Sequence, residues 1–173
     1  KIIKKPEETN DIFTKTSSSK GVIFVPAFVG LSSPHWLPNS KGMIYGLTPS
    51  VNKNNIIRAS LESIAFQIKD YLDDLEKKQK INCNHIFIDG GIVSNLAFMK
   101  FLCNTLEREI YVTDFQDMSS YGSALMGLLG MKIEKNLKDI SKYKKKYKIY
   151  LPDKKNFPKS YSEWKKVLKN FYL

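Results

Sequence analysis

The chain has 173 residues, 42% of them hydrophobic and 12% aromatic, a composition typical of a globular protein with a buried core. No apolar run approaches the roughly eighteen residues that span a bilayer, and the first residues hold no apolar core of signal-peptide length. The net charge of +11 comes almost entirely from residues 132–173, which carry 14 lysines, four acidic residues and no arginine. A tail of this kind is more typical of a solvated surface than of a nucleic-acid site, so we expect neither a nucleic-acid nor a membrane partner. Cys83 and Cys103 lack metal-type spacing and are interpreted as reduced thiols, which favours a cytoplasmic location.

The first fifty residues combine polar segments with two short apolar runs. Residues 1–20 are polar and charged, and we expect the run 14–20 to be an exposed connector. Four consecutive β-forming residues, 22–25, predict a strand that is buried on both faces and ends at Pro26. A loop rich in Gly, Ser and Pro covers residues 30–38, and residues 43–47 predict a second, shorter strand.

The longest predicted helix follows Asn52, which is a credible N-cap. Apolar residues recur in it at spacings of three and four, which places on one face Ile57, Leu61, Ile64, Ala65, Ile68, Leu72 and Leu75. Glu62 and Asp70 lie eight residues apart on this helix, and neither has a partner that would indicate acid–base chemistry. The solvated face of the helix is expected to hold Asp70, Asp73, Asp74 and Glu76.

Strands and helices alternate through the rest of the chain. Residues 86–88 and 109–113 predict strands, and a helix between them is indicated by the stripe of Phe98, Leu102 and Leu106. A third helix, rich in small residues, is expected to start at the cap candidate Ser119 and to pack closely against a sheet or a ligand. A short helix in the tail, over residues 162–171, is expected to dock on the domain through Tyr161, Trp164 and Phe171. This order of elements predicts an α/β fold with parallel neighbouring strands.

The clearest chemical pattern runs from Asp89 to Asn95. Ligands of α/β sheets bind at the carboxyl ends of strands, and Asp89-Gly90-Gly91 stands where a predicted strand passes into a helix. Two adjacent glycines allow adenine or phosphate to approach the backbone, and the amide of Asn95 could reach the same ligand. The same residues fit a plain turn with Asn95 as a helix cap, which the pattern alone favours. No phosphate loop, zinc-binding helix or nucleophile elbow accompanies them, so no complete catalytic constellation is present.

Several separated stretches resemble the C-terminal half of the FGGY carbohydrate kinases. Residues 21–28 are similar to the strand before the family's Gly-Leu-x-x-Pro-x-Trp loop, which corresponds to residues 30–36 here. Residues 42–48 and 58–67 resemble the second family signature, whose ending Glu-Ser-Ile-Ala-Phe-Gln is most similar to the glycerol kinases.

Two further segments extend this resemblance, and two residues depart from it. Residues 89–95 resemble the adenosine motif shared with actin and hexokinase, and residues 157–167 resemble the closing segment of the family. Leu37 replaces the family's Asp after Trp36, and Lys41 stands where Arg is usual, which leaves the detailed contacts of this loop open.

The resemblance implies an actin-like, ribonuclease-H-like α/β domain in an ATP-dependent kinase. Residues 1–131 would be the C-terminal part of its nucleotide-binding domain, and residues 132–173 a C-terminal extension packed on it. Gly91 and Asn95 match the family's nucleotide-binding residues, and Gly90 would support them. The parent would transfer the γ-phosphate of ATP to glycerol, with Mg²⁺ bridging the phosphates, and would form a homo-oligomer.

The family's catalytic Asp and its glycerol-binding residues match no residue here, so no catalytic residue is assigned to this chain. We therefore expect the 173-residue chain to be inactive alone. Three alternatives stay open: another FGGY kinase acting on a pentulose or related sugar, a non-catalytic binding module, and a basic RNA-associated protein.

Overall fold

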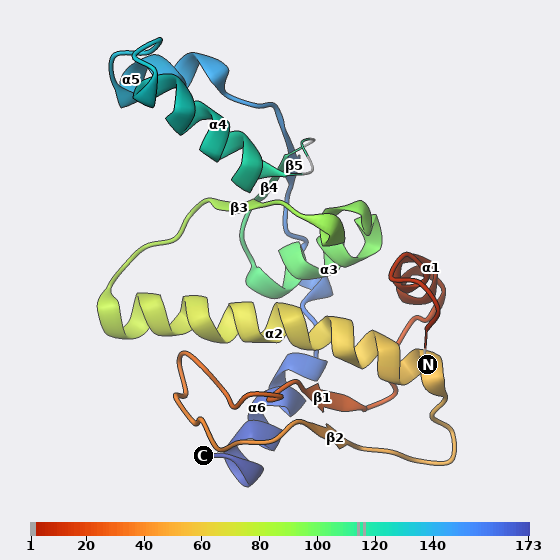
Figure 1. The fold of residues 1–173 in the computed structure, drawn as a ribbon. Coiled ribbons are helices and arrows are strands. Elements are labelled where there is room, and N and C mark those ends of the chain that lie inside the picture. The colour runs from red at the N-terminus through yellow and green to blue at the C-terminus, as the bar shows by residue number, and fades with distance from the viewer. Residues whose placement is uncertain (1–2, 114, 116) are drawn as a thin grey trace.

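A long central helix separates two small sheets in the computed structural model, which describes residues 3–113, 115 and 117–173 (Figure 1). The central helix is α2 (Lys53–Gln79). On one side of it lies an antiparallel pair of strands, β1 (Ile23–Val25) and β2 (Met43–Tyr45). On the other side lies a three-stranded sheet formed by β3 (Ile86–Ile88), β4 (Ile110–Thr113) and β5 (Tyr147–Tyr150).

The remaining elements are helices. The α-helices are α1 (Glu8–Lys15), α3 (Leu96–Leu106), α4 (Met118–Gly130), α5 (Leu137–Ile140) and α6 (Ser160–Phe171). Three short 3₁₀ turns are η1 (Gly91–Ser94), η2 (Ser141–Tyr143) and η3 (Lys154–Asn156). None of the helices in the described part of the chain is long and apolar enough to cross a membrane.

The α2 helix begins as its sequence predicts. The side chain of Asn52 accepts hydrogen bonds from the backbone nitrogens of Asn54 (2.9 Å) and Asn55 (3.3 Å), and the Asn55 side chain accepts one from the nitrogen of Asn52 (3.0 Å). These reciprocal bonds satisfy backbone donors that no residue inside the helix can pair. The predicted apolar face is confirmed except at Ile64, which is 37% exposed.

The expectation of parallel neighbouring strands holds for only part of the molecule. Strands β3 and β4 are parallel, with Ile86 opposite Ile110, and α3 connects them. Strand β1 does not join this sheet, because the chain folds back after it and pairs it antiparallel with β2. Strand β5, inside the lysine-rich tail, was not predicted and pairs antiparallel with β4.

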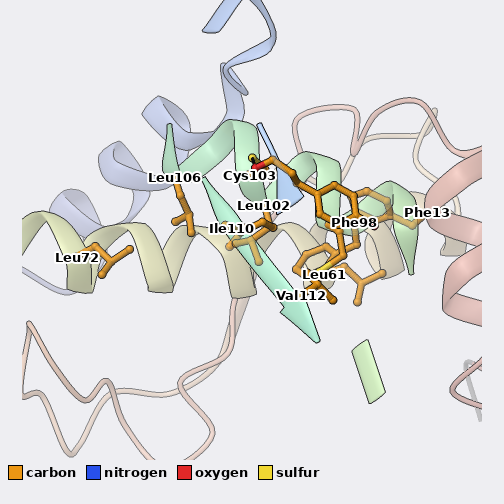
Figure 2. Packing of buried hydrophobic residues seen from close by; sticks show 12 residues of the cluster. Phe13, Leu61, Leu72, Phe98, Leu102, Cys103, Leu106, Ile110 and Val112 are labelled. Carbon is orange, nitrogen blue, oxygen red and sulfur yellow. Dashed lines mark hydrogen bonds between the residues drawn. The ribbon is translucent and has the colours of Figure 1, made fainter. Parts of the chain in front are cut away.

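Buried side chains form two cores, one on each side of α2. The first core lies between α2, α3 and the three-stranded sheet, and its side chains are shown in Figure 2. Within it, burial raises the pKa of the Cys103 thiol to about 11, and this thiol donates to the carbonyl oxygen of Tyr150 at 3.3 Å. The second core packs β1 and α6 against α2, and its central members are Ile23, Val25, Phe66, Trp164 and Leu168.

The exposed connector expected over residues 14–20 is confirmed except at Ser19, which is 4% exposed, but the polar segment before it forms α1 and contributes a core residue. Phe13 is 3% exposed, and its ring packs edge-on against the rings of Phe98 (5.7 Å between centroids) and Phe101 (5.5 Å). The guanidinium of Arg58 lies 4.2 Å from the centroid of the Phe13 ring, a cation–π contact. One aromatic residue in a polar helix gives no recognisable apolar period, yet Phe13 is the buried residue of α1.

Helix α4 projects away from the sheet, as Figure 1 shows near its top. Its N-cap is Asp117 and not the predicted Ser119, since the Asp117 carboxylate accepts from the backbone nitrogen of Ser120 at 2.9 Å. Close packing of its small residues against a sheet is also wrong within the described residues, whereas their packing against a ligand stays a prediction. No side chain of α4 is buried, and no atom outside the helix lies within 4 Å of a Cβ built at Gly122 or Gly127.

Candidate functional site

The strand-to-helix turn after β3 contains two adjacent glycines, Gly90 and Gly91, which have different structural roles. Gly90 has φ +90° and ψ 179°, a conformation that is open essentially to glycine alone. Gly91 begins the η1 turn and is exposed, and a Cβ placed on it would meet no atom within 4 Å. The backbone at Gly91 is therefore accessible to a flat or anionic ligand, while Gly90 provides the change of direction that exposes it.

Hydrogen bonds hold this turn in one shape. The nitrogen of Val93 donates to the carbonyl oxygen of Gly90 at 3.2 Å, and the nitrogen of Asn95 donates to that of Ile92 at 3.0 Å. The hydroxyl of Ser94 donates to the carbonyl oxygen of Gly91 at 2.9 Å. The glycine backbone is thus arranged before any ligand arrives.

Asn95 is both a helix cap and an incomplete hydrogen-bonding group. Its Oδ1 accepts from the backbone nitrogen of Phe98 at 3.0 Å and caps α3, as the plain-turn interpretation predicted. The residue is only 2% exposed, and its buried Nδ2 has no hydrogen-bond partner among the described residues. An unpaired buried donor costs about 1–3 kcal/mol. Nδ2 has almost no exposed surface, so an acceptor from outside the chain would relieve that cost only after neighbouring atoms move aside. The cap bond fixes Oδ1, and therefore also the direction in which Nδ2 points.

The two acidic residues that were expected to be unpartnered are both buried and paired. Oε1 of Glu62 accepts from Nε of Arg58 at 2.7 Å; burial raises the pKa of Glu62, and Arg58 opposes that rise. Asp70 is 3% exposed and was wrongly expected on the solvated face. Its carboxylate accepts hydrogen bonds from Tyr161 Oη (2.7 Å), Trp164 Nε1 (3.0 Å) and Lys165 Nζ (2.9 Å).

These contacts give Asp70 a structural task. Burial opposes ionisation of Asp70, but the hydrogen bonds from α6 hold its pKa below the usual value. Nε2 of His35 lies 3.4 Å from Oδ2 of Asp70, so this histidine belongs to the same cluster. The predicted docking of the tail through Tyr161 and Trp164 is confirmed, whereas Phe171, at 55% exposed, lies outside the buried stripe.

The described residues contain no complete catalytic set. Within residues 3–113, 115 and 117–173, no group of three or more His, Cys, Asp or Glu side chains could hold a metal ion. The turn at residues 90–95 lies at the carboxyl end of β3, beside the carboxyl end of its parallel neighbour β4, where ligands of α/β sheets bind.

Comparison with known proteins identifies the family. A model of the C-terminal domain of the FGGY family of carbohydrate kinases matches residues 3–131. The chain belongs to the FGGY family. The fold of this FGGY domain is the actin-like ATPase fold, which agrees with the fold expected from the sequence.

Curated relatives of this FGGY chain are kinases. It is 33% identical over 171 residues to a glycerol kinase of Thermococcus gammatolerans, a match that covers 98% of this chain and 34% of the relative. It is 38% identical over 130 residues to a glycerol kinase of Shewanella baltica, covering 75% of this chain and 26% of the relative. The chain therefore spans about a third or less of the relatives that it matches.

Solved structures agree on the fold. The crystal structure of Plasmodium falciparum glycerol kinase with ADP superimposes with a TM-score of 0.83 at 33% identity, covering 99% of this FGGY chain and 35% of that protein. A xylulose kinase from Lactobacillus acidophilus superimposes with a TM-score of 0.78 at 21% identity and covers 96% of this chain. The second match shows the shared fold alone.

Proposed function

We propose that the protein containing this chain is an ATP-dependent glycerol kinase that forms sn-glycerol 3-phosphate. In this proposal the chain supplies part of the wall that holds the adenine nucleotide. Support for the substrate comes from relatives named glycerol kinase that are about one-third identical over nearly the whole chain. Support for the nucleotide comes from the geometry at residues 90–95.

The observation that carries the proposal is the unpaired Nδ2 of Asn95 beside an open glycine turn. A structural cap needs only Oδ1, which leaves Nδ2 as a buried donor without a partner among the described residues. Adenine and ribose offer acceptor atoms and a flat shape that suit a donor next to a backbone without side chains. Gly91 and Asn95 would contact the nucleotide, and Gly90 would hold the turn open.

The other parts of the reaction are assigned to residues outside this chain. Mg²⁺ would be held chiefly by the nucleotide phosphates and would offset their charge during transfer. The base for the glycerol hydroxyl and the glycerol-binding residues would lie in the other two-thirds of the protein. We further propose a cytoplasmic, homo-oligomeric protein in which residues 1–131 complete the nucleotide-binding domain and residues 132–173 are its extension.

A second FGGY activity, on a pentulose or related sugar, is the competing assignment within the family. The structural matches to xylulose and gluconate kinases are at 21% and 22% identity and bear on fold only. Assaying the full-length protein with glycerol, xylulose and gluconate separates these assignments. Phosphorylation of a sugar in preference to glycerol would replace our proposal with the competing one.

The nucleotide site is tested with two variants of the full-length protein. Gly91→Val adds a branched side chain at the open backbone, and Asn95→Ser keeps a capping oxygen but removes the amide donor. We expect ATP and ADP to bind about tenfold more weakly to each variant, with glycerol affinity almost unchanged in calorimetry. Gly130→Val is the matched control, because Gly130 also has open space but lies at the far end of α4. Equal losses for glycerol and nucleotide, with intact circular dichroism, would show that this turn is not the nucleotide contact.

A further inference from the structure

A hollow of about 600 Å³ with a mixed polar and apolar lining lies away from the Gly90–Asn95 turn, where three distant parts of the chain meet. One side is the loop before β1, with Ser17, Ser18 and Ser19. Its floor comes from α2 and α3, and its other side comes from the segment around Lys159 that leads into α6. The proposed kinase function uses no residue of this hollow.

A buried ion pair lies at the floor of this hollow. The side chains of Arg58 and Glu62 are 12% and 5% exposed, and Nε of Arg58 donates to Oε1 of Glu62 at 2.7 Å. Nη1 of Arg58 donates to the carbonyl oxygens of Phe13 (2.9 Å) and Thr16. Nη2 takes part in none of these bonds. Of the three guanidinium nitrogens, Glu62 therefore uses Nε and the backbone before β1 uses Nη1, which leaves Nη2 outside both sets of bonds.

The second oxygen of the Glu62 carboxylate is incomplete. Oε2 is buried and has no hydrogen-bond partner among the described residues. The Ser19 side chain lies near this carboxylate and helps to lower the pKa of Glu62 against the larger effect of burial. Oε2 has almost no exposed surface, so a ligand reaches it only when a neighbouring side chain moves aside, most readily one in the exposed Ser17–Ser18 loop. A missing donor at a buried carboxylate points to a ligand that donates hydrogen bonds.

The remaining lining determines which ligand fits. The lining contains two basic residues, Arg58 and Lys159, and two acidic residues, Glu62 and Glu163. Both carboxylates are already paired, Glu62 with Arg58 and Glu163 with Lys166, so the hollow has no strong charge of either sign. Hydroxyl and amide groups that both donate and accept surround these charges, namely those of Ser17, Ser18, Asn104, Asn156 and Ser160. The ring of Phe101, with Ile23 and Pro158, adds an apolar surface.

We propose that this hollow binds a neutral polyhydroxy compound of monosaccharide size. One of its hydroxyls would donate to Oε2 of Glu62, another would accept from Nη2 of Arg58, and its C–H face would lie on Phe101. Because the ligand would touch the loop before β1, α2 and the segment before α6 together, it would also fasten the C-terminal segment to the domain.

A second hollow in the same molecule serves as a control for this proposal. This second hollow, of about 590 Å³, lies between residues 37–43 and the C-terminal Phe171 and Tyr172. It is similar in size but contains no buried ion pair among its lining residues. General weak association of sugars with protein surfaces would affect both hollows, whereas a built site would affect only the first.

The test measures saturation-transfer difference NMR of D-glucose on the full-length protein, with inorganic phosphate as the charged comparison. We expect saturation transfer from the protein to glucose. Adding inorganic phosphate should not reduce this transfer. Ser17→Trp, which fills the rim, and Glu62→Gln, which keeps the bond from Arg58 but replaces the accepting Oε2 with a donor, should each weaken glucose binding about tenfold. Asn39→Trp, in the second hollow, should leave it unchanged.

Three outcomes would overturn the proposal. These are no transfer to glucose from the native protein, equal transfer from all variants, and displacement of glucose by phosphate. Circular dichroism and nucleotide affinity of each variant separate these results from misfolding and from failure of the proposed kinase function, because the hollow and the Gly90–Asn95 turn share no residue.

Discussion

The indole nitrogen of Trp164 donates a hydrogen bond of 3.0 Å to Oδ2 of Asp70, a carboxylate that lies 94 residues earlier in the chain. Trp164 is almost completely buried, so this bond joins the C-terminal helix to α2 inside the second core. Tyr161 and Lys165 donate to the other oxygen of the same carboxylate. Asp70 is therefore the point at which α6 is fixed in place and direction.

Replacing Asp70 with Asn should destabilise the folded protein by about 3 kcal/mol. The change keeps the shape of the side chain but removes the charge that accepts three hydrogen bonds in a buried place. Urea unfolding at neutral pH measures the difference. Asp74→Asn is the matched control, because Asp74 pairs with the well-exposed Lys78 and should cost less than about 1 kcal/mol. A similar decrease in the free energy of unfolding for both variants would mean that the hydrogen bonds to Asp70 contribute no more to stability than an exposed ion pair does.

The contribution of Asp70 should disappear in acid. Its pKa lies below the ordinary value of 3.8, so the folded protein holds this proton less tightly than the unfolded chain does. The resulting stabilisation is fully present above about pH 4 and is lost as pH falls through the lower pKa of the folded state. The stability gap between the native protein and Asp70→Asn should be constant near neutrality and should narrow below about pH 4. A stability gap that stayed constant into stronger acid would contradict this assignment. The raised pKa of Glu62 affects both proteins equally and therefore cancels in the difference.

The 173-residue chain on its own should show no ATP-dependent phosphorylation of glycerol. Phosphoryl transfer needs a base, a phosphate cradle and a metal site, and the chain provides only part of a nucleotide wall in our proposal. A coupled assay for ADP release, with a glycerol-free blank, measures this. Turnover by the purified chain, with contaminating kinase excluded by mass spectrometry, would show that the catalytic residues lie here after all.

The lysine-rich tail should bind RNA only weakly and only at low salt. Half of its 14 lysines lie before β5, and the rest are spread from β5 to α6. Tyr161 and Trp164 are buried in the second core and cannot stack on bases. Binding should therefore be blind to sequence and largely lost near physiological ionic strength. Submicromolar RNA affinity at physiological salt, measured by fluorescence anisotropy, would support a nucleic-acid function instead.

Elements with a strong local signal could be predicted from the sequence. Helix α2, the β3–α3–β4 unit and the glycine turn at residues 90–91 each depend on residues that lie close together in the chain. Asn95 was predicted both as a cap and as a ligand contact. The structure confirms the cap and adds the unpaired Nδ2, whose state depends on the packing around it.

Features that depend on distant partners could not be predicted in the same way. Asp70 sits in a run with Asp73 and Asp74 that is typical of a solvated face, and only the arrival of α6 explains its burial. Strand β5 consists of Tyr147, Lys148, Ile149 and Tyr150 and lies in a lysine-rich segment. This composition gives no recognisable strand pattern, and the strand is defined by its pairing with β4. The family resemblance was more informative about function than any single residue, because the order of several ordinary motifs is rare by chance.

The hydrogen bonds to Asp70 also determine when the second core can form during translation. Their donors in α6 follow Asp70 by 91, 94 and 95 residues, so these contacts close a long loop and raise the contact order of the second core. Until the ribosome has translated α6, the side chains of β1 and Phe66 that face it have no cover. A nascent chain therefore exposes this surface to chaperones until α6 emerges. A frameshift within the codons of α6 would leave the finished polypeptide permanently in that state.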